Sequence, residues 1–273
     1  EPTIDALRHR GQAHPMHVES LHVRVLGPLS VFRDGELVAL PQSKKTRGLL
    51  AYLAITARAH RRERLCSLLW DVADDPRGAL RWSLSKIRPV VDSDSRRCLV
   101  ADRENVELSL DDGCLDWRRV RRELAGGLEE VSTERLIELE SVFEGELLEG
   151  LDLIDFDEFT AWCAAEREHA RSMHTRILQA LVERLSDSPT DALPFARELA
   201  RIDPIDENTR ANLIRLLTAA GAAVGSAPVG AVARSGPARR SRSRSPVVTA
   251  CRSAPARMQR GLRPTIPGSR FIG

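Results

Sequence analysis

The sequence predicts an α+β domain followed by an all-α domain and a basic tail. In residues 1–110, stretches with the alternating hydrophobic pattern of strands occur together with stretches that have the helical pattern. After residue 110 only helical patterns occur. Charge divides the chain in the same way. Residues 1–110 hold 18 basic and 14 acidic residues, a net charge of +4, and residues 111–221 hold 13 and 25, a net charge of −12. Residues 222–273 hold 10 basic residues and no acidic ones, and their periodicity is lost.

The first predicted element is a β-hairpin in residues 21–40. Apolar and polar residues alternate on both sides of Asp34-Gly35. An Asp-Gly pair between alternating runs is a strong short-range signal of a hairpin turn. We therefore expect two antiparallel strands here.

Two helices are predicted next. Residues 43–59 form a helical pattern with Ser43 as its N-cap, because a serine hydroxyl accepts a hydrogen bond from a free backbone N–H of the first turn. Residues 61–70 form a second, shorter pattern with three leucines on one face. His60, between them, is expected at the surface.

Residues 76–91 predict a third, amphipathic helix. Its apolar stripe is formed by Leu80, Leu84, Ile87 and Val91. No carboxylate occurs from Arg77 to Val91, although a solvated helix usually mixes both signs of charge. Pro89 is expected to kink this helix or end it early, and Trp82 to pack against the preceding loop.

A hairpin over residues 98–110 completes the first domain, with its turn at Arg103-Glu104-Asn105. Two strands, three helices and a terminal hairpin match a winged helix-turn-helix. The acidic half that follows contains a long helical pattern over residues 157–186. Residues 189–221 read as two helices that join at Asp203-Pro204 and end at Gly221, close to the ~34-residue period of tetratricopeptide repeats.

Several classes of protein are not supported by the sequence. No run of 18 apolar residues predicts a membrane span, and residues 1–15 lack the apolar region of a signal peptide. Five cysteines without a C-x-x-C pair indicate a reducing cytoplasm rather than disulfides or a zinc site. The common motifs of nucleotide-binding sites, serine hydrolases and zinc proteases do not occur. We therefore expect neither an enzyme nor a cofactor.

The two ends of the chain are interpreted separately. Residues 1–20 are expected to be a flexible extension, since the first methionine is Met16. Residues 222–273 consist largely of Ala, Arg, Ser, Pro and Gly, which typify disordered sequence. We hypothesise a frameshift near residue 222, and a native basic linker is the alternative.

The sequence also resembles a known family. The stretches "VRVLGPLSVFRDGELVAL", "SKKTRGLLAYL", "RRERLCSLLW" and "RGALRWSLSKIRPVV" resemble the DNA-binding half of the antibiotic-regulatory-protein (SARP) type of bacterial transcriptional activators, which has an OmpR/PhoB-type winged helix. The stretches "LLEGLDLIDFDEFTAWCAAERE" and "ARIDPIDENTRANLIRLLTAAG" resemble the bacterial transcriptional activation domain that follows in that family. The resemblance implies a winged helix in residues 21–110 and a helical, tetratricopeptide-like domain in residues 111–221.

The resemblance implies that the third helix enters the major groove of DNA and that the terminal hairpin is a wing. The helical period already places Arg81, Ser85, Lys86 and Arg88 on the outward side. Ser85 departs from the wider winged-helix class, in which its position is often basic. The full set of expected DNA contacts is Lys44, Lys45, Arg47, Arg62, Arg77, Arg81, Ser85, Lys86, Arg88 and Arg103.

The expected function is sequence-specific binding of promoter DNA by a transcriptional regulator, as an activator. Arginine can pair with guanine through two hydrogen bonds, and lysine and serine more often hold phosphates. The expected partner is double-stranded DNA, with RNA polymerase and a second copy of the chain as further candidates and no membrane. The alternative is a helical interaction scaffold whose winged helix binds protein rather than DNA.

Overall fold

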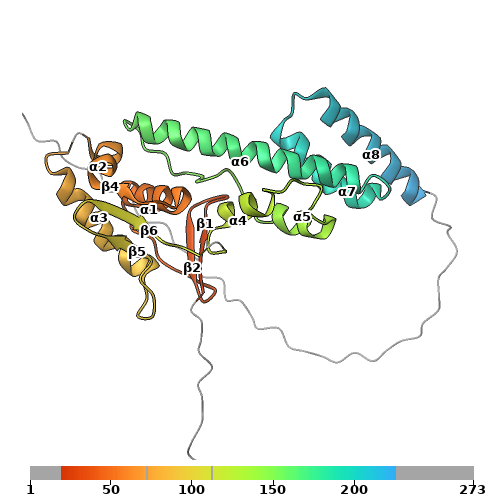
Figure 1. Cartoon of the computed structure of the whole chain (residues 1–273). Coiled ribbons are helices and arrows are strands. Elements are labelled where there is room, and N and C mark those ends of the chain that lie inside the picture. Colours follow the sequence, from red (N-terminus) through yellow and green to blue (C-terminus); the bar gives the residue numbers. More distant parts are fainter. Residues whose placement is uncertain (1–19, 72, 112, 226–273) are drawn as a thin grey trace, which may run out of the picture. The chain divides into compact units, whose positions relative to one another are not determined.

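The computed structural model describes residues 20–71, 73–111 and 113–225, all within one compact unit (Figure 1). The predicted N-terminal extension and almost all of the basic tail lie outside these residues, and so does the frameshift hypothesis. The described part is a winged-helix region followed by a helical region. No helix in it is long and apolar enough to cross a membrane.

The winged-helix region contains two small antiparallel sheets and three helices among the residues described. Its elements are β1 (Leu21–Arg24), β2 (Ser30–Arg33), β3 (Glu36–Leu37), α1 (Lys44–Thr56), β4 (His60–Arg61), α2 (Arg62–Trp70), α3 (Pro76–Val91), β5 (Leu99–Ala101) and β6 (Asn105–Leu108). The sheets have the strand orders β1-β2-β3 and β4-β6-β5.

The first sheet differs from its prediction by one strand. The predicted turn at Asp34-Gly35 is present and joins β2 to β3, with both residues at positive φ. The alternating run before this turn is divided into β1 and β2, which pair from Leu21–Arg33 to Arg24–Ser30. Gly27, at φ +134°, and Pro28, which has no backbone donor, separate the two strands.

The predicted hairpin of residues 98–110 is confirmed as β5 and β6. A two-residue strand, β4, adds to β6 through the pair His60–Val106. His60 is therefore buried, and its placement at the surface was wrong. Its Nε2 lies 2.7 Å from the Thr56 hydroxyl oxygen, and burial, followed by the charges of Arg58 and Arg64, lowers its pKa.

Helix α1 begins as predicted, since the Ser43 side chain accepts a hydrogen bond from the Thr46 N–H. It ends at Thr56, a turn earlier than expected, because Ala57 adopts the left-handed conformation. Helix α3 has the predicted bounds and contains Pro89 without ending there. Of the two expected effects of Pro89, early termination was therefore wrong, and a kink stays a prediction.

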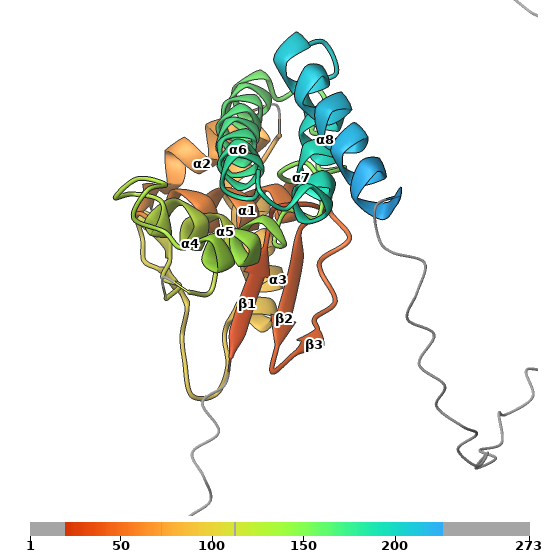
Figure 2. The same cartoon turned by 90° about the vertical axis from the view of Figure 1, so that its right-hand side faces the viewer.

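The helical region contains the elements α4 (Asp116–Glu123), α5 (Thr133–Glu140), α6 (Asp157–Arg184), α7 (Pro189–Ile202) and α8 (Glu207–Gly225). Helix α7 packs against both α6 and α8 (Figure 2). Ala192, Ala196 and Leu216 form a small apolar cluster between α7 and α8. Helix α8 continues past Gly221, so the predicted end at that residue was wrong; a glycine inside a helix costs only about 1 kcal/mol.

The two regions share one apolar cluster, which runs from β1 to α6. The rings of Tyr52 on α1 and Trp162 on α6 meet at a centroid distance of 4.8 Å. The Asp116 carboxylate at the start of α4 accepts hydrogen bonds from the N–H groups of Val25 and Leu26. Burial raises the pKa of Asp116, against the opposing effect of these bonds. The domain boundary at residues 110 and 111 stays a prediction.

Candidate nucleic-acid interface

Helix α3 has one buried and one exposed face. Its start is fixed by Asp75, whose carboxylate accepts a hydrogen bond from the Gly78 N–H at 2.8 Å, and by Pro76 in the first turn. The buried face consists of Leu80, Ser83, Leu84, Ile87, Val90 and Val91. The opposite face therefore presents the intervening residues to solvent.

A buried polar pair orients α3 against α1. The hydroxyl oxygens of Thr46 and Ser83 lie 3.0 Å apart, and both side chains are buried. Buried hydroxyls are stable only when hydrogen-bonded, so this pair favours one rotation of α3 about its axis. That rotation directs Arg81, Ser85 and Lys86 away from the core.

The C-terminal end of α3 is held by a side chain from β2. Arg33 on β2 donates through Nη2 to the carbonyl oxygens of Pro89, Val90 and Asp92 at 3.3, 3.1 and 2.9 Å. The last carbonyls of a helix lack partners inside it, so a cation placed here both bonds them and complements the helix dipole. These bonds explain how the last turn of α3 persists beyond Pro89.

Asp92 connects the end of α3 to the wing. Its buried carboxylate accepts hydrogen bonds from the N–H groups of Cys98 and Leu99 at 2.9 and 2.8 Å. Arg88 donates through Nη1 to the Asp92 carboxylate at 3.3 Å and to the Leu99 carbonyl at 3.2 Å. The Arg88 side chain is 41% exposed. It is partly committed to this junction rather than directed wholly outward.

The exposed middle of α3 carries Arg81, Trp82, Ser85 and Lys86. The side chain of Arg81 is 68% exposed, with the nearest carboxylate oxygen, on Asp75, 3.8 Å from its Nη2. Trp82 is 52% exposed, so the expectation that it packs against the preceding loop was wrong. The Lys86 ammonium lies 5.6 Å from the centroid of the Trp82 ring, and the Ser85 hydroxyl donates to the Trp82 carbonyl.

The basic residues at the start of α1 point in different directions. Lys44 is exposed. The Lys45 ammonium lies 4.3 Å from the ring centroid of Phe156, in the helical region. Arg47 Nε is buried and has no hydrogen-bond partner among the residues described, while its Nη2 reaches the Gln42 carbonyl at 3.5 Å.

The remaining predicted contacts lie on α2, at the start of α3 and on the wing. Arg62 donates through Nε to the Asp102 carbonyl at 2.8 Å, which secures the wing turn. The Asp102 carboxylate accepts the N–H groups of Glu104 and Asn105, and these bonds hold its pKa below the usual value. Arg103 is exposed at this turn, between two acidic residues. Arg77 is exposed and pairs with Glu63 at 2.7 Å.

Sequence reasoning did not single out Arg33 or Asp92, which position α3 without forming its exposed face. A basic residue at the end of a strand and an acidic one after a helix are common, and only the fold brings them together. The described residues contain no cluster of ligands suited to a metal ion.

The chain was compared with family models, with curated proteins and with solved structures. No family model matches the chain, and no curated protein matches it. A matching solved structure is described as "Mycobacterium tuberculosis EmbR in complex with low affinity phosphopeptide", with 23% sequence identity and a TM-score of 0.48. The match covers 74% of this chain and 66% of the other, so this chain spans less than two thirds of that protein's length.

Proposed function

We propose that the chain is a transcriptional regulator that binds double-stranded DNA in a sequence-specific manner through the exposed face of α3. The observation that carries this proposal is the set of Arg81, Trp82 and Lys86 on one exposed helix face, backed by the buried Thr46–Ser83 pair and flanked by a β-hairpin. A helix of this kind fits the major groove, where base edges are read.

Arg81 is the proposed base-reading residue, because its guanidinium is largely exposed and its approach to Asp75 is long. Arg88 Nη1 is held by Asp92 and Leu99, so we assign Arg88 to a phosphate through its other nitrogens. The remaining contacts are assigned to phosphates or sugars, which fix the register without reading sequence. This group consists of Lys44, Lys45, Arg47, Arg62, Arg77, Ser85, Lys86 and Arg103.

The ion pairs of Arg77 and Arg81 do not oppose this assignment. Both pairs are exposed on both sides, and exposed pairs contribute only about 0–1 kcal/mol. A phosphate or a guanine can therefore replace Glu63 or Asp75 as the partner without a large loss.

The helical region is assigned to partners in activation. RNA polymerase is the proposed target, with a second copy of the chain as a further partner. The four cysteines among the described residues are free thiols, which fits a reducing cytoplasm as the proposed compartment. Neither a cofactor nor a catalytic role is part of the proposal.

Selection of genomic fragments tests the function directly. The full chain is mixed with fragmented genomic DNA, and the bound fragments are sequenced. We expect a shared sequence to be enriched by the wild type and lost with Arg81→Ala. Arg210→Ala, an exposed change on α8, is the matched control and should enrich the same sequence. Failure of the wild type to enrich any shared sequence would rule out sequence-specific binding.

A protein-binding scaffold is the second candidate, and one observation favours it. Helix α8 exposes Ile214 and Leu217 three residues apart, and Ile205 is exposed before it. The dependence of binding on salt concentration distinguishes the two candidate functions. Binding to phosphates releases counterions, so the affinity for DNA falls steeply as the salt concentration rises. A scaffold would bind a protein partner through α8 and show no preference among duplexes.

A further inference from the structure

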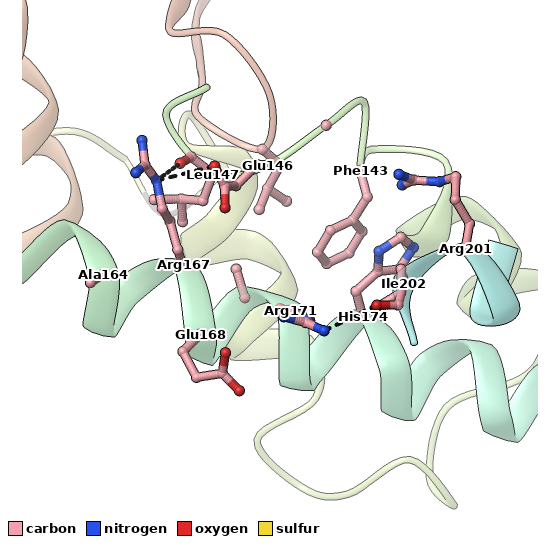
Figure 3. Close-up of a pocket in the computed structure, with 13 residues that line it drawn as sticks. Phe143, Glu146, Leu147, Ala164, Arg167, Glu168, Arg171, His174, Arg201 and Ile202 are labelled. Carbon is pink, nitrogen blue, oxygen red and sulfur yellow. Dashed lines mark hydrogen bonds and ion pairs between the residues drawn. The ribbon is translucent and has the colours of Figure 1, made fainter. Parts of the chain in front are cut away.

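A cavity of about 510 Å³ lies in the helical region, away from α3 (Figure 3). It is bounded by α6, by residues 143–147 and by the C-terminal end of α7. Its volume is in the range of about 300–1,000 Å³ that is typical of small-molecule sites. Phe143, Leu147 and Ile202 supply apolar walls, so the cavity can take the body of a small organic molecule.

His174 lines this cavity, and one nitrogen of its buried ring lacks a hydrogen-bond partner among the described residues. Its side chain is only 9% exposed and stacks on Phe143, with ring centroids 4.1 Å apart and planes 6° from parallel. Its Nε2 is buried and has no hydrogen-bond partner within the described part of the chain. The nearest carboxylate oxygen, on Glu140, is 3.6 Å away, which is too long for a hydrogen bond. Buried polar atoms are nearly always paired, so this nitrogen calls for a ligand.

Three arginines, Arg167, Arg171 and Arg201, line the cavity together with two glutamates, Glu146 and Glu168. Arg171 uses one nitrogen for the Ile202 carbonyl at 3.0 Å, and Arg201 uses Nε and Nη2 for Glu198. Each guanidinium keeps N–H groups that form no other hydrogen bond within the described residues. Arg167 differs, because it is committed to Asp152 and to the carbonyls of Leu147 and Leu148.

An acidic hollow of about 690 Å³ adjoins the cavity and shares Phe143, Gly145, Glu146, His174 and Arg201 with it. Its remaining charged lining residues are Glu140, Glu144, Glu149 and Glu198. Phe143 and His174 therefore lie where the arginines of the cavity meet the glutamates of the hollow, and Glu146 and Arg201 line both spaces.

We propose that this paired cavity binds a small zwitterion of the amino-acid class. The carboxylate of the ligand lies between Arg171 and Arg201, and its ammonium group faces Glu140 and Glu146. Its side chain packs against Phe143 and Ile202, and His174 Nε2 forms the missing hydrogen bond. Charge at both ends distinguishes this ligand from a simple anion, which the glutamates would repel, and from a simple amine, which the arginines would repel.

Isothermal titration calorimetry of the full chain with each standard L-amino acid tests the proposal without DNA. We expect at least one amino acid to bind at millimolar concentration or tighter. Its decarboxylated amine and its deaminated acid should each bind at least about tenfold more weakly, because each lacks one charged end. Binding of an amino acid with no loss for either analogue would overturn the assignment, as would the absence of binding by every amino acid.

Two variants locate the site. Arg171→Gln removes a cation that borders the cavity, and Arg176→Gln is its matched control on an exposed position of the same helix. We expect the first to weaken binding at least about tenfold and the second to leave it unchanged. His174→Phe, checked for folding by circular dichroism, should abolish binding while retaining the ring stack. Equal binding by Arg171→Gln and wild type would place the ligand elsewhere. Since none of these measurements uses DNA, their failure is distinct from failure of the proposed function.

Discussion

Trp82 gives the exposed face of α3 a large apolar surface next to the Lys86 ammonium. In the major groove the one apolar group of the base edges is the methyl group of thymine. An exposed indole in a row of cations can therefore recognise a methyl group, while the cations hold the phosphates.

We predict that Trp82 packs against a thymine methyl in the selected site. Replacing that thymidine by deoxyuridine removes only the methyl group and should weaken binding by the wild type by about 0.8 kcal/mol. The same replacement should leave binding by Trp82→Ala unchanged, since the contact is already absent. Fluorescence anisotropy with a series of singly substituted duplexes measures both. A loss of equal size in wild type and variant at every thymidine would refute the contact.

Replacing Arg33 is expected to change the stability of the folded protein. Arg33→Met keeps an unbranched apolar stem but removes three hydrogen bonds to the end of α3. Hydrogen bonds to a charged group contribute about 1.5–3 kcal/mol, so we expect the free energy of unfolding in urea to fall by about that amount. Arg24→Met, which removes the exposed pair with Glu144, should change it by at most about 1 kcal/mol. Similar values for the two variants would mean that Arg33 does not cap α3.

At the scale of elements, α1 and α6 approach closely at Gly48. A Cβ atom there would lie 3.1 Å from both Leu153 Cδ1 and Phe159 Cζ. This contact joins the winged-helix region to the helical region, so the packing of the two can be tested at a single residue.

Gly48→Val should lower the free energy of unfolding by about 1–3 kcal/mol, because the added methyl groups overpack the contact between α1 and α6. Gly221→Val on α8 is the matched control, since no atom lies within 4 Å of a Cβ there. Thermal or urea denaturation measures both. If Gly48→Val is as stable as Gly221→Val, the two helices do not pack as described.

A further link between elements joins α4 to α5. The Glu123 carboxylate accepts two hydrogen bonds from Arg135, and these hold the pKa of Glu123 below its usual value. A carboxylate with a depressed pKa stabilises the fold above its unfolded pKa of about 4.3, and this stabilisation is lost as the pH falls through the lower folded value.

Glu123→Gln should therefore lower the melting temperature at pH 7, and the difference from wild type should shrink below about pH 4. Differential scanning calorimetry at a series of pH values measures this. Glu134→Gln is a useful comparison, because the depressed pKa of Glu134 arises from local bonds at its helix start rather than from a partner on α4. A difference for Glu123→Gln that stays constant down to pH 3 would contradict the linkage.

At the scale of the whole molecule, the spacing of apolar residues predicted those helices and strands that are determined by short stretches of sequence. The bounds of α3, the Ser43 cap and the β5–β6 hairpin follow from short patterns that act within one element. The exposure of Trp82 and the inward bonds of Arg88 depend on contacts between elements, which periodicity does not contain. For the same reason the sequence did not reveal the continuous apolar cluster that joins the two predicted domains.

The charge of the C-terminal tail determines how specific binding must be measured. The segment beyond the described residues carries arginines and no acidic residue, so the full chain is expected to bind any duplex to some degree. Specific binding must therefore be measured as a ratio of affinities rather than as a single affinity.

Sequence reading by α3 is tested most directly by the ratio of affinities for the selected duplex and for a scrambled duplex of equal length, at one salt concentration. Contacts of the basic tail to phosphates act equally on both duplexes and cancel in this ratio. We predict that Arg81→Ala reduces the ratio by a factor equivalent to about 1–3 kcal/mol, while Arg210→Ala leaves it unchanged. An unchanged ratio in Arg81→Ala, or a wild-type ratio of one, would contradict sequence reading by α3.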